Sequence, residues 1–414
     1  MQGISNKPAL PLLKKEIEGI FGKKIAASGD CIFLSNEILF KTHQAISSNT
    51  LRRLFGLVKT DFHPSSTTLH ILVKYCGFSS LQELVKLRKA GPPAIDDNSY
   101  AESVLNYLLS LFTYTPVKEC NDKDFMAFVK ITLDFLKRHP ELIDNFQKGI
   151  ARSKNGREYY YEKAINIDDL NSFYGDGLRY YLVENKTTKA QVLGHSLLCL
   201  RNWLVENKAG VNHHYQEVVK HTLTKDNHPY LWVRYYAAQL MHAEVNHLPI
   251  DKIIEAAQQS HALLKQQELQ DRCQFFPCFE YVLCPVLIIM GRANDALYFI
   301  NFARKEYVNK IPDIDDGFYD TLELFEAMAA YQSGNIPLAE KLFSRLHPTR
   351  FHYLNKKSCT ILYLFLCEGL NKQKESTQQQ LNELIGETGF TRFKQIEQYK
   401  MTAIMGAMQE KRAV

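Results

Sequence analysis

From residue 100 onward, apolar residues recur at helical spacing in one segment after another, and no stretch alternates apolar and polar residues as a strand would. Gly and Pro, which interrupt helices, number 20 and 14 among 414 residues, below their usual shares of about 7% and 5%. The sequence therefore predicts an all-α protein. The helical segments expected after residue 100 are 100–114, 122–138, 140–151, 168–184, 187–206, 213–224, 229–245, 250–266, 271–290, 293–308, 317–332, 336–346, 356–370, 375–386 and 391–409.

A helical hairpin pattern is clearest in residues 322–343, LELFEAMAAYQSGNIPLAEKLF. Small residues lie on the first predicted helix, Gly334 and Asn335 form the turn, and Ala339 and Phe343 lie on the second helix. Small residues let the two helices of a hairpin approach closely, while large apolar residues fill the space between hairpins. The pattern resembles the helical hairpin of tetratricopeptide repeats.

The same pattern recurs upstream, around Gly291 and Ala296, and more faintly around Ala256. The equivalent alanines are 40 and 43 residues apart, more than the 34 of tetratricopeptide repeats. The resemblance implies an α-solenoid of irregular hairpins over residues 100–414, with the repeats clearest in 250–346.

Residues 91–99, GPPAIDDNS, are the strongest linker signal in the sequence, and they separate an N-terminal domain, residues 1–90, from the predicted solenoid. This domain contains 13 Lys and Arg but 6 Asp and Glu, a net charge of +7, whereas the whole chain carries +5. A small basic module on a near-neutral body is typical of a domain that binds a polyanion. A small domain can also carry such an excess for solubility alone.

Three short patterns in the N-terminal domain carry a second resemblance. Each combines a helix-capping serine, a Thr-Leu pair or a terminal glycine, and they read Ile46-Ser47-x-x-Thr50-Leu51-x-Arg53-Leu54-x-Gly56, then Pro64-Ser65-x-x-Thr68-Leu69, then Tyr75-x-Gly77-Phe78. They resemble the helix-turn-helix domain of phage-repressor-type regulators and an N-terminal module of many Bacteroidota proteins. The helices expected here are 9–21, 30–43, one capped by Ser47, 67–76, and one opened by Ser79 or Ser80.

The repressor resemblance implies that the helix after Ser47 is a recognition helix, which places short polar side chains against base edges in the major groove of double-stranded DNA. An asparagine there can pair with adenine, and an arginine can contact guanine or phosphate. Lys41 and Lys74 are candidates for further contacts to the DNA backbone. The predicted DNA-binding residues are Ser47, Ser48, Asn49, Thr50, Arg52, Arg53 and Lys59.

The sequence departs from the repressor pattern at two positions. Lys41 and Ala45 stand where those motifs usually hold a small residue and a turn glycine. We therefore expect either that Ala45 adopts a left-handed backbone conformation, at some cost in free energy, or that the turn is built differently. If the module no longer reads DNA, the alternative is a helical docking domain with solvated arginines.

Other chemistry has little support in the sequence. No apolar run reaches the roughly 18 residues of a membrane span, no secretory signal is recognisable, and nine cysteines without a C-x-x-C pair indicate reduced thiols in a cytoplasmic protein. Phosphate-loop, metalloprotease and serine-nucleophile motifs are absent, so we expect no catalytic residues, no metal site and no cofactor. The histidines of residues 213–221 are expected to be solvated, and the tyrosines of 157–181 either pack between hairpins or line a groove.

This organisation looks like that of bacterial peptide-sensing transcriptional regulators. The resemblance implies a regulator with double-stranded DNA as the partner of the N-terminal domain, while the solenoid binds a peptide or protein or mediates homodimerisation. One alternative is a non-catalytic protein–protein interaction adaptor with a degenerate helix-turn-helix domain. The other is an enzyme whose site is assembled from scattered polar residues.

Overall fold

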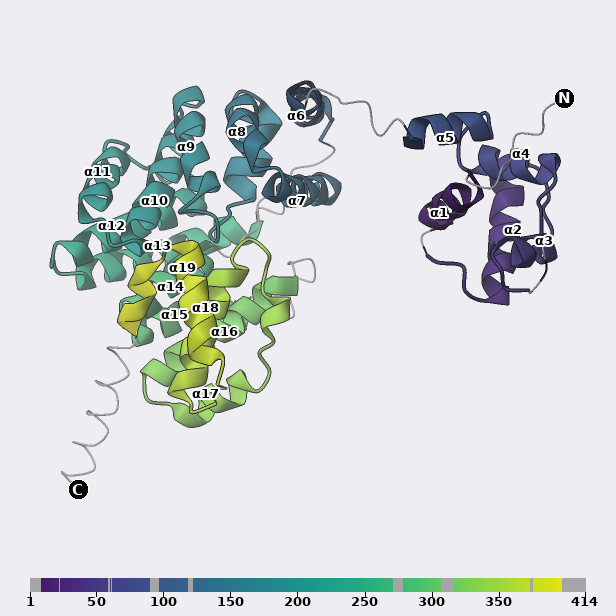
Figure 1. The fold of residues 1–414 in the computed structure, drawn as a ribbon. Coiled ribbons are helices and arrows are strands. Elements are labelled where there is room, and N and C mark those ends of the chain that lie inside the picture. The colour runs from purple at the N-terminus through teal and green to yellow at the C-terminus, as the bar shows by residue number, and fades with distance from the viewer. Residues whose placement is uncertain are drawn as a thin grey trace. The chain divides into compact units, whose positions relative to one another are not determined.

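The computed structural model describes residues 9–21, 23–58, 60, 62–89, 97–117, 122–270, 278–306, 316–372 and 375–396. Within these residues every regular element is a helix, as the sequence predicted, and none is a strand. The chain divides into two compact units, which we call the head (residues 1–102) and the body (residues 103–414) (Figure 1).

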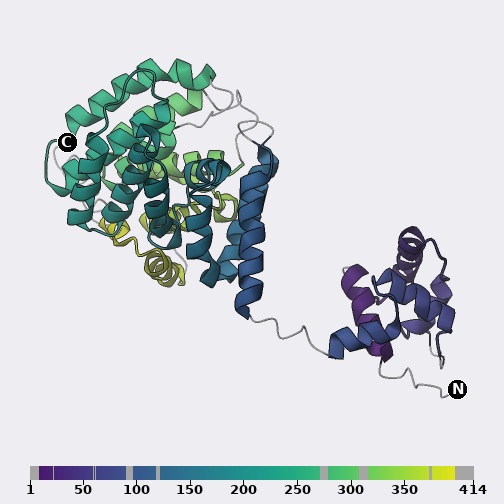
Figure 2. The same ribbon diagram turned by 90° about the horizontal axis from the view of Figure 1, so that it is seen from above.

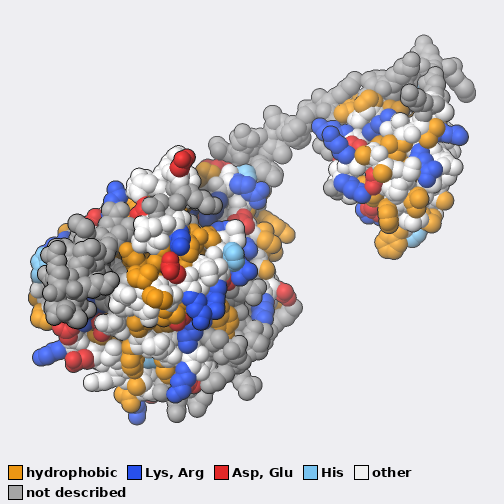
Figure 3. All heavy atoms as spheres, turned by 90° about the horizontal axis from the view of Figure 1, so that it is seen from below, with side chains coloured by type: hydrophobic (Ala, Val, Ile, Leu, Met, Phe, Trp, Pro, Cys, Tyr) orange, Lys and Arg blue, Asp and Glu red, His pale blue; other side chains and the backbone are white. Residues whose placement is uncertain are grey.

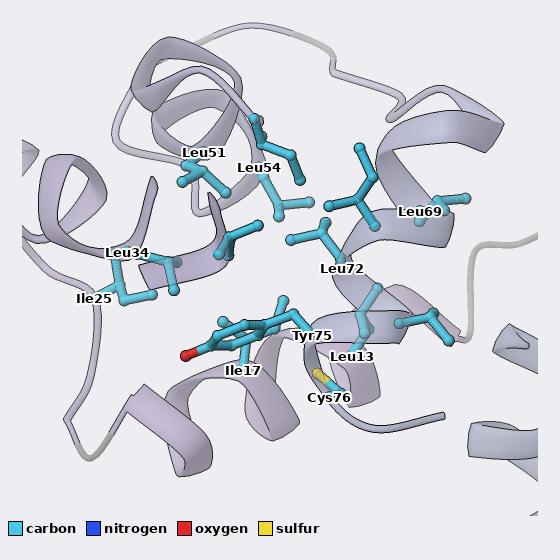
Figure 4. Close-up of a cluster of buried hydrophobic side chains, with 14 of the residues drawn as sticks. Leu13, Ile17, Ile25, Leu34, Leu51, Leu54, Leu69, Leu72, Tyr75 and Cys76 are labelled. Atoms are coloured by element: carbon cyan, nitrogen blue, oxygen red, sulfur yellow. The ribbon is translucent and has the colours of Figure 1, made fainter. Parts of the chain in front are cut away.

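The head packs its helices around one hydrophobic core. Leu13, Leu34, Leu51 and Leu72, from four different helices, are completely buried there, and Figure 4 shows these side chains pointing toward a common centre. Each such leucine stabilises the fold by about 1.5–3 kcal/mol. The helices are α1 (Ala9–Phe21), α2 (Ser28–Thr42), α3 (Ser48–Leu54), α4 (Ser66–Tyr75) and α5 (Leu81–Lys89).

The ends of α3 and α4 are built in the same way, and the cap at Ser47 and the stops at Gly56 and Gly77 are those that the sequence predicted. The hydroxyl of Ser47 accepts a hydrogen bond from the Thr50 amide at 3.1 Å, and Ser65 caps α4 equally through the Thr68 amide. At the other ends, Gly56 and Gly77 have φ of 77° and 81°, a left-handed conformation that favours glycine. These two helices therefore begin and end where the sequence indicates.

Helix α6 (Asp97–Tyr114) crosses the boundary between the two units. Residues 97–99, which the sequence placed in the linker, are its first residues. The remainder of the predicted linker, residues 91–96, lies outside the described residues.

The body continues as an array of helices and short helical turns (Figure 2). Their bounds are α7 (Lys123–Arg138), η1 (Pro140–Leu142), α8 (Ile143–Ile150), η2 (Gly156–Lys163), α9 (Phe173–Glu184), α10 (Thr188–Leu204), α11 (Lys208–Val219), α12 (Pro229–Val245), α13 (Asp251–Gln270), α14 (Cys278–Ile289), α15 (Ala293–Glu306), α16 (Asp316–Gln332), α17 (Ile336–Phe343), η3 (Pro348–Arg350), α18 (Lys356–Gly369), α19 (Thr377–Thr388) and η4 (Thr391–Gln395).

Helices α10 to α19 form successive hairpins, α10–α11, α12–α13, α14–α15, α16–α17 and α18–α19. The first helix of each hairpin also packs on the first helix of the next, in the order α10, α12, α14, α16 and α18. This is the nearest-neighbour stacking of an α-solenoid. The predicted hairpins around Gly291 and Gly334 are the third and fourth members of the series.

Each of these five hairpins turns at one residue in the left-handed conformation. These residues are Glu206, His247, Gly291, Gly334 and Asn371, with φ between 54° and 82°. In every case the next amide donates to a carbonyl five residues earlier, at 2.8–2.9 Å, which closes the last turn of the first helix. The hairpin repeat therefore includes three turns without glycine in addition to the two at Gly291 and Gly334.

The C-terminal end of the described chain packs back onto earlier parts of the body. Element η4 contacts α10, α14 and α19, and Figures 1 and 2 both show the yellow end of the ribbon beside the teal helices. Residues 391–395 form a short 3₁₀ turn, whereas the sequence predicted an α-helix over 391–409. Residues 397–409 of that prediction lie outside the described residues.

Five of the six tyrosines of residues 157–181 are interior, and Tyr180 is partly exposed. Tyr159, Tyr160, Tyr161, Tyr174 and Tyr181 are completely buried, and burial raises the pKa of the last four hydroxyls far above the usual range. These five residues therefore pack the body and do not line an open groove. Three of them lie in η2, a segment of π-helix that the sequence pattern did not predict.

Within the described residues, no helix combines the length and apolar character needed to cross a bilayer.

Candidate nucleic-acid interface

Helix α3 has one buried face and one solvent face. Leu51 and Leu54 are 0% and 2% exposed in the core of the head, whereas Asn49 and Arg53 are exposed. Positions four apart lie on the same side of a helix, so the amide of Asn49 and the guanidinium of Arg53 form one polar surface. Both side chains are therefore exposed to solvent on the side of α3 that faces away from the core of the head.

The hydroxyls at the start of α3 are engaged in its cap. Ser47 binds the Thr50 amide, and its hydroxyl lies 2.9 Å from that of Thr50. Ser47 remains exposed, while Ser48 and Thr50 are partly buried. The cap fixes the first turn of α3 and leaves Ser47 at the surface beside Asn49.

Arg52 has a different environment from Arg53. It is partly buried, its Nη1 donates to the Asn49 side-chain oxygen at 3.2 Å, and its Nε has no hydrogen-bond partner among the described residues. Burial raises the pKa of the Cys31 thiol, and the nearby Arg52 charge opposes that shift. Arg52 therefore acts first as a local support for Asn49.

The lysines predicted beside α3 differ in availability. Lys41 forms an ion pair with Glu37 at 2.7 Å and lies 5.1 Å from the centre of the Tyr75 ring. Partial burial alone would raise the pKa of Glu37, but hydrogen bonds from Lys41 and Tyr75 outweigh it and lower that pKa. Lys74 is exposed. Lys59 lies outside the described residues.

The turn between α2 and α3 is built differently from a glycine turn at position 45. His43, the C-cap of α2, takes the left-handed conformation with φ 56°, and its amide donates to the Leu39 carbonyl at 2.9 Å. Ala45 does not have a positive φ. The expectation that the turn is built differently is therefore the correct one, because the chain reverses direction at His43, two residues before Ala45.

The outward face of α2 is apolar, a feature that sequence reasoning missed. Ile32 and Leu39 are 48% exposed, Phe33 is 68% exposed and Phe40 is 82% exposed; we call these four residues the α2 stripe. Figure 3 shows apolar side chains reaching the surface of the head among Lys and Arg. The signal was present in the sequence, since residues 31–40 place apolar residues on both sides of the helix.

Of the three histidines predicted to be solvated, His213 is exposed, whereas His214 and His221 are partly buried. His195 of α10 and His214 of α11 are partly buried, with their Nδ1 atoms 3.1 Å apart. Burial lowers the pKa of each to about 4. Among the described residues, no three His, Cys, Asp or Glu side chains are arranged to hold one metal ion.

No family model, curated protein or solved structure matches this chain. Its function must therefore be inferred from its own residues.

Proposed function

We propose that the head binds double-stranded DNA through α3, as the DNA-binding domain of a transcriptional regulator. The observation that carries this proposal is the solvent face of α3, where Asn49 and Arg53 stand together above the buried Leu51 and Leu54. An asparagine and an arginine one turn apart suit the donor and acceptor pattern of the major groove. The net charge of +7 over residues 1–90 supplies the general attraction to phosphate.

Asn49 and Arg53 have separate roles in this proposal. Asn49, held by Arg52, pairs with a base edge, while Arg53 contacts guanine or a phosphate. Helix α2 precedes α3 as the first helix of a helix-turn-helix unit, with the His43 turn between them. The body then binds a peptide or protein, or joins two copies of the chain, and so alters how two heads are spaced on DNA.

Duplex binding by the full chain at several salt concentrations tests the proposal. Arg53→Ala should weaken binding about tenfold at low salt and reduce the salt dependence by about one phosphate contact. Asn49→Ala should change the preference among sequences while the salt dependence stays the same. Lys24→Ala, which removes an exposed charge outside α3, is the matched control. Equal affinity of the wild type and Arg53→Ala would contradict the proposal.

The α2 stripe favours a second candidate, a protein–protein interaction adaptor whose head docks another protein. Two phenylalanines that are 68% and 82% exposed on one helix face are unusual on a small domain and typical of interaction sites. Under this candidate, Arg53→Ala has no effect on function. Phe40→Ser instead weakens the association of the head with its partner protein, and the head shows no salt-dependent affinity for DNA.

A further inference from the structure

Residues 390–396, which we call the C-terminal motif, pack onto the body as a short bound peptide would. Phe390 is fully buried, Phe393 and Ile396 are each 3% exposed, and Arg392 is 6% exposed. The element that carries them, η4, contacts α10 and α14 as well as its neighbour α19. Buried aromatic and arginine side chains are the usual anchors of a peptide on a protein surface.

Arg392 is recognised at three points. Its Nε donates to the Trp203 carbonyl at 2.7 Å, and its Nη1 donates to the two carboxylate oxygens of Glu244 at 2.8 and 2.6 Å. The guanidinium also lies 4.7 Å from the centre of the Trp203 ring. The Trp203 indole in turn donates to Glu244 at 2.5 Å, which fixes the carboxylate. Lysine has no planar group that could make this set of contacts.

Glu206 holds both ends of η4. Its two carboxylate oxygens accept from the Thr391 hydroxyl at 2.8 Å and from the Gln395 amide at 2.7 Å. Glu206 is also the left-handed residue of the α10–α11 turn, with φ 59°, a conformation that a non-glycine residue adopts only at a cost in free energy. We call Trp203, Glu206 and Glu244 the arginine clasp.

The C-terminal motif joins α19 through a glycine. Gly389 has φ 69°, and its amide donates to the Ile385 carbonyl at 2.8 Å, which completes the end of α19. A helix that is closed before the motif begins keeps its own hydrogen bonds if the motif leaves. The motif is therefore a separable anchor, attached at a residue with wide conformational freedom.

We propose that the arginine clasp is a peptide-binding site, that the C-terminal motif fills it as an internal ligand, and that a partner segment with an arginine followed by an aromatic residue competes for it. This inference rests on the proposed peptide-binding function of the body. A tethered ligand acts at an effective concentration in the millimolar range, so the competitor must be present in excess or bind more tightly. Its binding releases residues 390–396 from α10.

A synthetic peptide with the sequence of residues 389–396, GFTRFKQI, labelled with fluorescein, tests the inference by fluorescence anisotropy. The protein is the full chain with Arg392→Ala, which weakens the internal ligand and leaves the clasp intact. We expect this variant to bind the peptide at least tenfold more tightly than the wild type does. The peptide with lysine in place of arginine should bind at least tenfold more weakly, because it lacks the planar donor group.

Arg392→Ala combined with Glu244→Gln is the matched control and should lose the affinity for the peptide. If Arg392→Ala does not melt cooperatively, Arg392→Lys replaces it, since it preserves the charge and most of the volume. Equal binding by the wild type and the variant, equal binding of the lysine peptide, or no binding by a folded variant would each overturn the inference. DNA binding by the head is a separate measurement, so failure here is distinguishable from failure of the proposed regulator.

Discussion

At the scale of single residues, neighbours in the sequence have unequal roles. Arg52 and Arg53 were both predicted to contact DNA, yet Arg53 is exposed while Arg52 is partly buried and supports Asn49. One step along a helix turns a side chain by about 100°, so adjacent residues meet different surroundings. The charge of a residue can be known from the sequence, but its availability depends on this rotation and on what packs beside it.

The His195–His214 pair predicts a loss of stability of the body in mild acid. Each pKa is lowered to about 4 from 6.5, first because burial disfavours the charged ring. A lowered pKa in the folded state means that the stabilisation is complete above pH 6.5 and is lost as the pH falls toward 4. Chemical denaturation between about pH 7 and pH 4 should show this decline.

His195→Gln should make that decline shallower, because one of the two buried rings can no longer take up a proton. His347→Gln, a substitution of an exposed histidine in the body, is the matched control and should leave the slope unchanged. The same slope in all three proteins would show that other groups cause the acid sensitivity.

At the scale of elements, the turn chemistry explains how much of the fold could be predicted. Gly291 and Gly334 mark two hairpin turns because glycine is the usual left-handed residue, and both hairpins were predicted. The turns at Glu206 and Asn371 have the same backbone but carry a side chain, so no pattern identified them, and the hairpin that turns at His247 was predicted only faintly, around Ala256. Periodicity found the helices on either side, whereas their membership of one repeating series was predicted only through the resemblance to tetratricopeptide repeats.

The candidate interface was predictable to a similar degree. The Ser47 cap and the buried Leu51 and Leu54 follow from local sequence rules, so the start of α3 and the face that it buries could be predicted. The His43 turn could not, because a left-handed histidine has no sequence signature. The α2 stripe was missed although residues 31–40 place apolar residues on both sides of the helix, because apolar residues are read as core.

The left-handed turns predict opposite effects of glycine at two equivalent positions. His247→Gly should stabilise the body by about 0.5–1 kcal/mol, because His247 is exposed and glycine relieves the strain of its φ of 55°. Glu206→Gly should destabilise it, since the hydrogen bonds to Thr391 and Gln395 are lost with the side chain. Urea unfolding of both variants measures the difference, and stabilisation by Glu206→Gly would contradict this expectation.

At the scale of the whole molecule, contacts between residues distant in the sequence hold the last hairpin of the body against earlier helices. Asp168, before α9, accepts hydrogen bonds from the Lys357 and Ser358 amides at 2.7 and 2.9 Å, and from the Ser358 hydroxyl at 2.9 Å. It thereby caps α18, whose own N-cap residue Asn355 makes no such bond. Together with the arginine clasp, this cap ties the last hairpin to residues that precede it by 148 positions or more.

The Asp168 cap predicts a destabilisation confined to the body. Asp168→Ala removes three hydrogen bonds to a buried carboxylate, and the expected cost is about 2 kcal/mol, since the desolvation that raises the pKa of Asp168 offsets part of their value. Hydrogen exchange should then be faster in α18 and α19. The amides of α2 and α4 should exchange as in the wild type, because the described residues that form the core of the head lie between positions 10 and 84.

Asp144→Ala is the matched control, because Asp144 pairs with Arg179 and Tyr180 at the exposed surface, where an ion pair adds little stability. Unchanged hydrogen exchange in α18 after Asp168→Ala would mean that the Asp168 cap does not stabilise the last hairpin. Faster exchange in the head as well would mean that the two units do not respond separately. We expect a loss of protection in the last hairpin alone. That result would show that this hairpin is held against earlier helices by side-chain contacts such as the Asp168 cap and the arginine clasp, which no local pattern of the sequence predicts.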